Sequence, residues 1–218
     1  MSEGKEIISV SKHTMKRLPV YLSYLKSIND GTIENISSPV IARALNLNEV
    51  QVRKDLASVS STGGKPKTGF DLLQLINDIE NVLGYNNVNE AVVVGVGNLG
   101  KALLKYSGFE ECGVRITAAF EKNPELLGEE IGGKTVVSVS RLQNLCERMK
   151  IHIGIITVPA EEAQEICDIL VDSGIRGIWN FAPVKLNVPD NVAVRDENLG
   201  VSLSLLSMQM KEIMKKNV

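Results

Sequence analysis

Hydrophobic residues in the first part of the chain recur every three or four positions, which is the spacing of one face of an α-helix. Such a stripe runs through Thr14–Ile28 with basic residues around it, and it predicts a basic amphipathic helix. Its apolar members are Met15, Leu18, Leu22 and Leu25. After Gly31 a second helix is expected, with Ser38 as N-cap and Pro39 as its first residue, because both are helix start signals.

A third helix is predicted to start at Asn48, because Asn48 followed three residues later by Gln51 resembles a capping box. The turn before it contains Asn46, which tolerates a left-handed conformation. The core positions of this helix are expected at Val52, Leu56 and Val59. Lys54 then points away from the core, flanked by Arg53 and Gln51. Two short helices joined by a tight turn, the second with a basic outer face, are typical of a helix-turn-helix.

The segment Ser58–Gly69 follows the third helix, is rich in Ser, Thr and Gly, and has no acidic residue. It contains Lys65-Pro66-Lys67 and therefore fits a flexible basic wing beside a recognition helix. A plainer interpretation stays open, namely a solvated three-helix bundle followed by a linker.

After one more helix, expected over Asp71–Leu83 with Gly84 as its stop, the pattern changes to short continuous apolar runs. Runs of this kind are typical of strands buried on both faces of a parallel sheet. They cover residues 91–94, 114–120, 135–139, 151–158, 177–181 and 192–194. Helices are expected between the earlier ones, over 99–106, 141–149 and 161–173. The alternation predicts an α/β fold with a doubly wound parallel sheet.

The last segment, Leu199–Lys216, is predicted to be a helix that is more hydrophobic than a solvent-facing tail should be. Its apolar residues include Leu203, Leu205, Leu206, Met208, Met210 and Ile213. We therefore expect this helix to pack on a partner subunit.

The net charge of −2 conceals an asymmetry along the chain. Residues 1–70 carry 10 Lys and Arg against 6 Asp and Glu, whereas residues 71–218 carry 14 against 20. The basic N-terminal part is the one suited to a polyanion. The N-terminus lacks the features of a secretion signal and no apolar run has the length of a membrane span, so a cytoplasmic protein without membrane contact is expected. Cys112, Cys146 and Cys167 lack metal-ligand spacing and are expected to be plain thiols.

A glycine-rich motif, Gly95-Val96-Gly97-Asn98-Leu99-Gly100, stands directly after the first predicted strand and opens a helix. In this context the first glycine permits a tight turn, the second lets a pyrophosphate approach the backbone, and the third allows close packing of helix on strand. Glu121 ends the next strand at the distance expected for a carboxylate that binds ribose hydroxyls. The motif and Glu121 predict a dinucleotide site that prefers NAD(H) to NADP(H), although Lys122 beside it weakens that preference. Glu121 as an ordinary surface residue is the alternative.

Two loops follow later strands at the same edge of the predicted sheet. They are Thr157-Val158-Pro159 and Asn180-Phe181-Ala182-Pro183. Ligands bind outside the carboxyl ends of the strands in such sheets, so these loops are the expected walls of a nicotinamide pocket. Their prolines are also compatible with ordinary turns.

An enzyme that transfers hydride to a substrate needs a proton donor or acceptor and a domain that shapes a substrate pocket. The two histidines are His13, in the basic N-terminal region, and His152, in a predicted strand where it has a structural role. Only one helix follows the last strand. These features favour a protein that binds the cofactor without catalysis.

With these motifs in view, the chain resembles the Rex family of redox-sensing repressors over nearly its whole length. The most specific stretches are Gln51–Leu56, the glycine motif, Ile155–Ala160 and Gly177–Pro183. The resemblance implies a homodimer whose C-terminal helices swap between subunits. It also implies binding to an inverted-repeat operator in double-stranded DNA with an A·T-rich centre, permitted by NAD⁺ and released by NADH.

The resemblance further implies roles for individual residues. Arg53 and Lys54 would contact DNA from the recognition helix, Lys65 and Lys67 would reach the minor groove, and Tyr106 would lie near the nicotinamide. The full set expected to bind DNA is Lys16, Arg17, Gln51, Arg53, Lys54, Ser58, Lys65 and Lys67. Two departures concern the wing, where the family commonly has an Arg-Gly pair followed by Gly-Tyr but residues 63–70 do not, and Asn198, which replaces an acidic residue that pairs with the tyrosine across the dimer.

The expected organisation is a winged helix-turn-helix domain over residues 1–84, a Rossmann domain over 85–198 and a swapped dimerisation helix over 199–218. Two other functions stay open from the sequence. One is a small NAD-dependent oxidoreductase with an N-terminal helical oligomerisation domain. The other is a regulatory module that binds CoA or another nucleotide, because the same glycine loop serves other phosphates.

Overall fold

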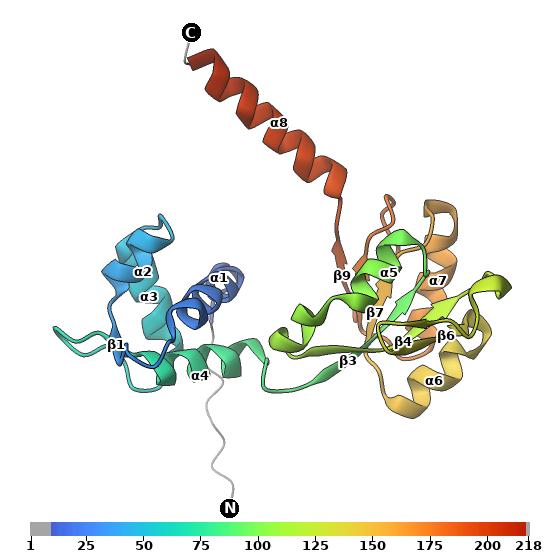
Figure 1. The fold of residues 1–218 in the computed structure, drawn as a ribbon, viewed down its shortest axis with the longest axis horizontal. Coiled ribbons are helices and arrows are strands. Elements are labelled where there is room, and N and C mark those ends of the chain that lie inside the picture. The colour runs from blue at the N-terminus through green and yellow to red at the C-terminus, as the bar shows by residue number, and fades with distance from the viewer. Residues whose placement is uncertain (1–9, 217–218) are drawn as a thin grey trace, which may run out of the picture. The chain divides into compact units, whose positions relative to one another are not determined.

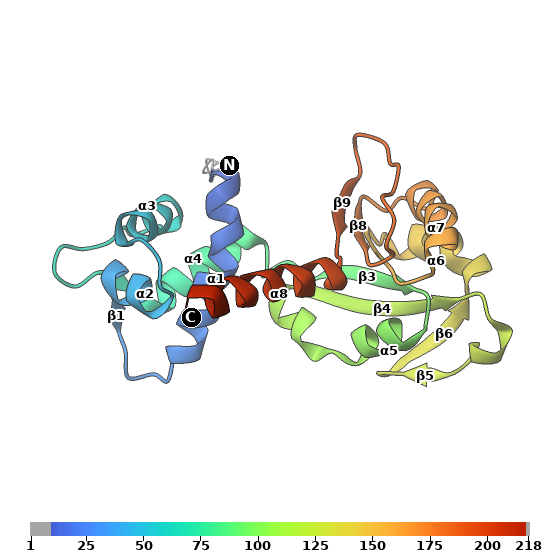
Figure 2. The ribbon, with the colours of Figure 1, turned by 90° about the horizontal axis from the view of Figure 1, so that it is seen from above.

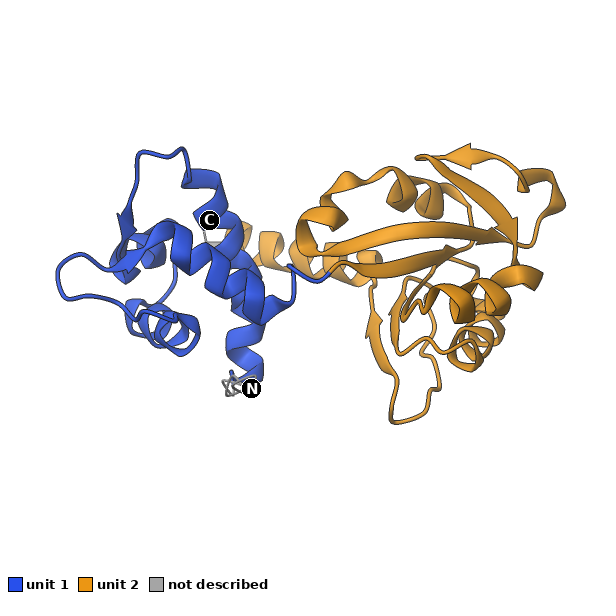
Figure 3. Ribbon diagram, turned by 90° about the horizontal axis from the view of Figure 1, so that it is seen from below, with its two compact units in different colours: residues 1–87 blue, residues 88–218 orange. Residues whose placement is uncertain are grey.

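The computed structural model describes residues 10–216 and divides the chain into two units, residues 1–87 and 88–218 (Figure 3). The division falls a few residues beyond the predicted end of the first domain at residue 84. The N-terminal residues on which the absence of a secretion signal was argued lie outside the described range. Within the described range, no helix combines the length and apolar character needed to cross a membrane.

The described part of unit 1 is built from four helices and a two-stranded antiparallel ribbon (Figure 1). The elements are α1 (Lys12–Ile28), β1 (Asn35–Ile36), α2 (Ser38–Ala44), α3 (Glu49–Val59), β2 (Phe70–Asp71) and α4 (Leu72–Leu83). The predicted stripes of α1 and α3 form one buried core, in which Leu18, Val52 and Leu56 are fully buried. The ribbon was missed by the sequence patterns because each strand has two residues.

The caps of these helices follow the predicted chemistry with two differences. Asn48 accepts a hydrogen bond from the backbone N–H of Gln51 at 3.1 Å, but the Gln51 side chain bonds Asp55 and does not close the capping box. The N-cap of α2 is Ser37 and not Ser38, because the carbonyl of Ser37 accepts the first helical hydrogen bonds. Asn46 is left-handed as predicted, with φ 52°.

Unit 2 contains a seven-stranded sheet in the order β5-β6-β4-β3-β7-β8-β9 (Figures 1 and 2). The strands are β3 (Asn89–Val94), β4 (Val114–Glu121), β5 (Glu130–Ile131), β6 (Lys134–Ser138), β7 (Ile153–Ile156), β8 (Gly177–Asn180) and β9 (Ala193–Asp196). Neighbouring strands are parallel except β5 and β6, whose antiparallel pairing the sequence patterns missed. The predicted doubly wound fold is therefore confirmed.

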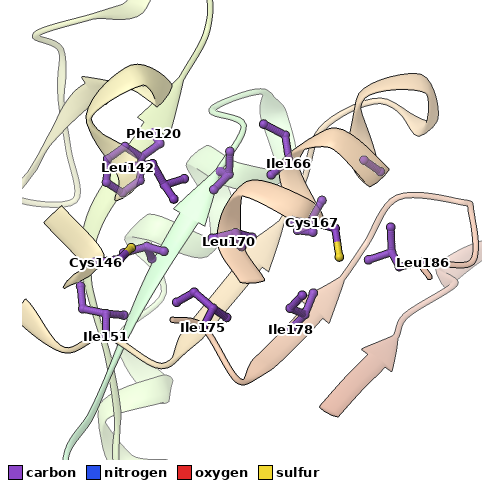
Figure 4. Close-up of a cluster of buried hydrophobic side chains, with 14 of the residues drawn as sticks. Phe120, Leu142, Cys146, Ile151, Ile166, Cys167, Leu170, Ile175, Ile178 and Leu186 are labelled. Atoms are coloured by element: carbon purple, nitrogen blue, oxygen red, sulfur yellow. The ribbon is translucent and has the colours of Figure 1, made fainter. Parts of the chain in front are cut away.

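Helices α5 (Asn98–Lys105), α6 (Leu142–Met149) and α7 (Ala160–Asp172) cover the two faces of this sheet. Helix α8 (Leu199–Lys216) follows the last strand and does not pack on the sheet (Figure 1). Short 3₁₀ turns are η1 (Ser107–Cys112), η2 (Pro124–Leu126) and η3 (Val139–Arg141). Leu142, Cys146, Cys167 and Leu170 of α6 and α7 pack on one face (Figure 4), and Leu104 of α5 packs on the other. The cysteines are free thiols, and only Cys112 is exposed.

The strand predicted over residues 151–158 is shorter than expected. Arg176 and Gly177 both donate their backbone N–H groups to the carbonyl of His152, at 2.9 Å each, and β7 starts one residue later at Ile153. His152 is an exposed residue outside the strand, contrary to the prediction that it lies within one.

Most described residues of helix α8 are exposed, and many of them are apolar. Its exposed large residues are Leu199, Val201, Leu203, Leu205, Leu206, Met208, Met210, Ile213 and Met214. Leu203, for example, retains 68% of its accessible surface. Exposed apolar surface of this extent is unusual on a monomer and is typical of interaction sites.

Candidate functional site

Four loops leave the carboxyl edge of the sheet side by side. Val94, the last residue of β3, pairs with Phe120 of β4 on one side and with Ile156 of β7 on the other, and Ile156 pairs with Asn180 of β8. The chain runs outward from β3 to β4 and β6, then returns to place β7 on the other side of β3. Such a reversal of strand order is where open α/β sheets bind their ligands.

The three glycines of the motif occupy three different environments. Gly95 has φ +95°, and a Cβ built there would lie 2.8 Å from Val158 Cγ1. A Cβ on Gly100 would collide with the carbonyl oxygen of Gly95, so α5 packs against the loop without room for a side chain. A Cβ on Gly97 would meet nothing within 4 Å. These are the turn, the packing contact and the open approach to the backbone that a pyrophosphate requires, so the residues present fit a dinucleotide.

Helix α5 begins at this open approach. Its N-cap is Gly97, which supplies no side-chain cap, and the first helical hydrogen bond runs from Lys101 N–H to the Gly97 carbonyl at 2.9 Å. The N–H groups of the first turn, from Asn98 and Leu99 onward, therefore point outward with the positive end of the helix dipole. This is the arrangement that holds phosphate at a helix N-terminus.

Glu121 is fixed by backbone donors at the end of β4. Its Oε2 accepts the N–H of Val96 at 2.7 Å, and its Oε1 accepts the N–H groups of Lys122 at 2.7 Å and Asn123 at 2.9 Å. Burial by itself raises the pKa of this carboxyl, but the three backbone donors outweigh burial and lower the pKa below its ordinary value. The carboxylate therefore stays ionised beside the glycine loop. The ammonium of Lys122 turns away to Glu162, 3.3 Å distant.

Thr157 joins the loop after β7 to the glycine loop. Its hydroxyl lies 2.7 Å from the carbonyl oxygen of Gly95 and 3.1 Å from that of Val94, and it can donate its one hydrogen to either. Val158 packs against the position of the missing Gly95 side chain, and exposed Pro159 is the N-cap of α7. The loop predicted as a wall is thus attached to the end of β3 and to the glycine loop that follows it.

Asn180 organises the second wall. Its fully buried side chain donates to the carbonyl of Val184 and to Asp196, each at 2.8 Å, and accepts the N–H of Ala182 at 3.0 Å. These bonds curl the Phe181–Pro183 loop around the amide. Asn180 therefore shapes the wall from beneath, while Phe181 and Pro183 lie nearer the surface.

Aromatic rings form a row from this wall to Tyr106. Phe181 and Trp179 have ring centroids 4.5 Å apart, Trp179 and Phe109 are 5.7 Å apart, and Phe109 and Tyr106 are 4.8 Å apart. Tyr106 ends the row with 61% of its surface exposed. Tyr106 and Phe181 were expected near the nicotinamide from the sequence, whereas Phe109 and Trp179 had no role predicted there.

In unit 1, a groove runs between α3, the N-terminal end of α2 and the loop that follows α3. Four basic side chains line it: Arg53, Lys54, Lys65 and Lys67. The structure thus brings these four predicted residues together. Lys16, Arg17, Gln51 and Ser58 are not among the described lining residues.

Two of the predicted residues that do not line the groove, Arg17 and Gln51, bond a buried carboxylate. Asp55 of α3 accepts hydrogen bonds from Arg17 Nε at 2.7 Å, Arg17 Nη2 at 2.8 Å, Tyr21 at 2.8 Å, Gln51 at 2.9 Å and Thr14 at 3.0 Å. Burial by itself raises the Asp55 pKa, but these donors outweigh burial and lower the pKa to about 2. The cluster locks α3 onto α1 and so orients the groove face of α3. Its signal in the sequence is a charged residue at a core position, three residues after Val52.

The loop after α3 is a short hairpin. Lys65 and Gly69 exchange two backbone hydrogen bonds, of 2.7 and 2.9 Å, and Lys67 at the tip is left-handed with φ 73°. Its root is fixed by Asp78 of α4, which accepts the N–H and the hydroxyl of Ser61 at 2.7 and 2.9 Å. The predicted wing is therefore a structured hairpin that presents its two lysines beside α3.

A winged-helix unit with a basic groove and a Rossmann unit with a dinucleotide-type glycine loop define the class of two-domain, nucleotide-responsive DNA-binding proteins. Residues 9–57 match a family model described as "Putative DNA-binding protein N-terminus", and residues 86–184 match one described as "CoA binding domain".

Relatives that match over nearly the whole chain identify its family more specifically than these two partial matches do. The chain is 41% identical to "Redox-sensing transcriptional repressor Rex" of Treponema denticola, over 90% of this chain and 93% of that protein. It is 36% identical to the protein of the same name from Porphyromonas gingivalis, over 94% and 93% of the two chains. The chain belongs to the Rex family.

Two solved structures also match nearly the whole chain. The "Crystal structure of RSP in complex with beta-NAD+ and operator DNA" matches with a TM-score of 0.86 and 34% identity, over 95% of this chain and 96% of that chain. The "Crystal structure of RSP in complex with beta-NADH" matches with a TM-score of 0.83 and 33% identity, over 96% and 99%.

Proposed function

We propose that this protein is a redox-sensing transcriptional repressor that binds operator DNA and is released from it when NADH binds. The observation that carries the proposal is that one chain has both a cation-lined groove on a winged helix and a glycine loop flanked by an ionised Glu121. Relatives of this chain are named as such repressors, and not as enzymes, over nearly the same length.

The cofactor is NAD(H), and different residues of unit 2 bind its pyrophosphate, its adenosine ribose and its nicotinamide. The N–H groups at the start of α5 and the open backbone at Gly97 hold the pyrophosphate. Glu121 accepts hydrogen bonds from the adenosine ribose and repels a 2′-phosphate, which favours NAD(H) over NADP(H). Thr157–Pro159 and Asn180–Pro183 form the walls around the nicotinamide, whose ring is cationic in NAD⁺ and neutral in NADH.

The DNA ligand is an A·T-rich inverted repeat. Arg53 and Lys54 enter the major groove on α3, and Lys65 and Lys67 reach the minor groove from the wing. Lys16 adds a cation on the exposed side of α1. Arg17 orients α3 from α1 through its ion pair with Asp55. Gln51 and Ser58 bond Asp55 within α3 itself, Gln51 through the Asp55 side chain and Ser58 through the Asp55 carbonyl.

A homodimer provides the two readers that an inverted repeat requires, with the apolar α8 helices exchanged between subunits. NADH shifts this dimer only by its differential affinity for the arrangements that hold and release DNA. The two cofactors differ at the nicotinamide, so the discrimination arises at the walls and near Tyr106. The location that follows from this proposal is the cytoplasm, because the protein acts on operator DNA.

The test is fluorescence anisotropy of a labelled A·T-rich inverted-repeat duplex with the full chain, titrated with NADH and then NAD⁺ at fixed salt. We expect release by NADH at concentrations where NAD⁺ has no effect. Equal responses to both cofactors would exclude redox sensing, and steady substrate turnover without DNA binding would support a dehydrogenase instead.

Variants connect that assay to the groove. Lys54→Ala is expected to weaken operator binding by about 1 to 3 kcal/mol if Lys54 contacts a base, and to reduce the salt dependence of binding if it contacts phosphate. Lys185→Ala, which removes the same charge from an exposed position of unit 2, is the matched control and should bind as the parent does.

A further inference from the structure

The basic groove of unit 1 contains one acidic side chain among its described lining residues. Glu49 is the first residue of α3 and is exposed, and it lines the groove together with Arg53 and Lys54 of the same helix. The sequence motifs predicted no role for Glu49. A carboxylate in a groove that holds a polyanion weakens binding unless it meets a hydrogen-bond donor there.

The carboxylate of Glu49 is free to meet such a donor. Glu49 lies four positions before Arg53, a spacing at which helical ion pairs form readily. The ion pairs of the described part of unit 1 are nevertheless Arg17–Asp55 and Lys26–Glu80, and Glu49 takes part in neither. Its oxygen atoms are therefore available to the groove.

The position of Glu49 on α3 selects the kind of donor. In helix-turn-helix proteins the first residues of the recognition helix contact base edges in the major groove. Phosphates and guanine N7 and O6 present only acceptors there, whereas cytosine presents its exocyclic N4 amino group, with which acidic side chains pair. Glu49 is thus matched to a base that Arg53 and Lys54 cannot recognise, because they are donors only.

We propose that Glu49 is a specificity-determining residue that accepts a hydrogen bond from the N4 amino group of one cytosine in each half-site. This inference rests on the proposed binding of operator DNA. Glu49 acts by attraction and by exclusion: opposite cytosine it is paired, and opposite a base that lacks a donor it is a desolvated anion.

The experiment is selection from a random duplex pool with the full-length parent protein and with Glu49→Ala and Glu49→Gln. The parent is expected to enrich cytosine at one position of each half-site. Glu49→Ala should lose the preference at that position alone. Glu49→Gln should shift the preference toward adenine, because a glutamine side chain pairs with adenine N6 and N7.

Affinities measured by anisotropy then quantify the effect on the selected duplex and on its C·G→T·A derivative. The parent should bind the derivative about 10-fold or more weakly, and Glu49→Ala should bind the two duplexes within about 2-fold. Glu49→Ala should also bind the derivative more tightly than the parent does, a gain that a merely structural role of Glu49 would not produce.

The control is Glu34→Ala, which removes the same charge from an exposed residue of unit 1 outside the groove and should leave the selected sequence unchanged. An identical selected sequence for the parent and Glu49→Ala would overturn the inference, as would a preference for adenine by the parent that depends on Glu49. Failure of the parent to enrich any sequence would instead overturn the proposed DNA-binding function.

Discussion

Asp55 in α3 and Arg17 in α1 form a two-point ion pair across 38 residues of sequence, with Oδ2 2.7 Å from Nε and Oδ1 2.8 Å from Nη2. Asp55 is 2% exposed and Arg17 is 29% exposed. The pair couples the orientation of α3, which lines the basic groove, to a residue that does not line it.

Replacement of Arg17 should therefore affect both folding and DNA binding. We expect Arg17→Ala to lower the free energy of unfolding of unit 1 by about 2 to 3 kcal/mol, because it leaves a buried carboxylate short of its cationic partner. Operator affinity should fall as well. Urea unfolding and anisotropy of the same preparation measure both effects. Lys12→Ala, at an exposed position of α1 to which no DNA contact is assigned, is the control for charge, and an Arg17→Ala variant of unchanged stability would contradict the prediction.

The same carboxylate predicts a loss of stability in acid. Its pKa is about 2 in the folded protein against 3.8 ordinarily, so the unfolded chain takes up the proton first as pH falls. The stabilisation, about 2 kcal/mol, is complete above pH of about 4 and disappears as pH falls toward about 2. Urea unfolding at a series of pH values, followed by the methyl resonances of Val52 and Leu56, should show this decline. In Asp55→Asn the decline should be shallower.

The glycine loop allows binding and folding to be separated. Gly97→Ala should fold normally, because its methyl group meets open space, yet bind NADH about 10-fold or more weakly, because that space is the approach of the pyrophosphate. Gly100→Ala should instead destabilise unit 2 by about 1 to 3 kcal/mol through its collision with the Gly95 carbonyl. Calorimetric titration with NADH and thermal unfolding distinguish the two variants, and a destabilised Gly97→Ala of full affinity would reverse the assignment.

Glu121 should set the choice between NADH and NADPH. Its lowered pKa keeps it charged at neutral pH, so Glu121→Gln removes the repulsion of a 2′-phosphate without changing the size of the side chain. We expect NADH to bind about 10-fold more weakly, because hydrogen bonds to a charged acceptor are the stronger kind, and the ratio of NADPH to NADH affinity to rise. Titration of the parent and of Glu121→Gln with NADH and with NADPH measures both effects. An unchanged ratio would assign the discrimination to another residue.

Helix α8 should hold the dimer together. A charge on its apolar surface, as in Leu203→Asp, is expected to convert the dimer to monomer in sedimentation at micromolar concentration, because the buried charge would lack a partner. Ser204→Asp adds the same charge at a neighbouring polar position and is expected to weaken the dimer far less. Operator affinity should fall together with dimerisation. A dimeric Leu203→Asp would place the interface elsewhere.

The sequence predicted what depends on local chemistry. The cap at Asn48, the left-handed stop at Gly84 and the buried run Ala91–Val94 each follow from a few neighbouring residues, and all three were confirmed. The glycine motif likewise predicted the tight turn at Gly95, the open backbone at Gly97 and the close packing at Gly100.

What the sequence could not predict depends on residues distant in the chain or on elements too short for a period. The donors to Asp55 lie up to 41 residues away, so nothing local marks Arg17 and Thr14 as its partners. The antiparallel pair of β5 and β6 has two register partners, Glu130–Thr135 and Ile131–Lys134, which is too few for alternation to be visible. The pairing of Gln51 with Asp55 also competes with the capping box that the spacing suggested.

The aromatic row of unit 2 gives this protein a built-in optical probe. Trp179 is the single tryptophan of the sequence, and its ring lies 4.5 Å from Phe181 in the wall next to the glycine loop. Reduced nicotinamide absorbs light in the range where tryptophan emits, and the oxidised form does not. Quenching of Trp179 emission therefore reports reduced cofactor directly on unlabelled protein, and because unit 1 has tyrosine but no tryptophan, the DNA-facing half adds no background of its own.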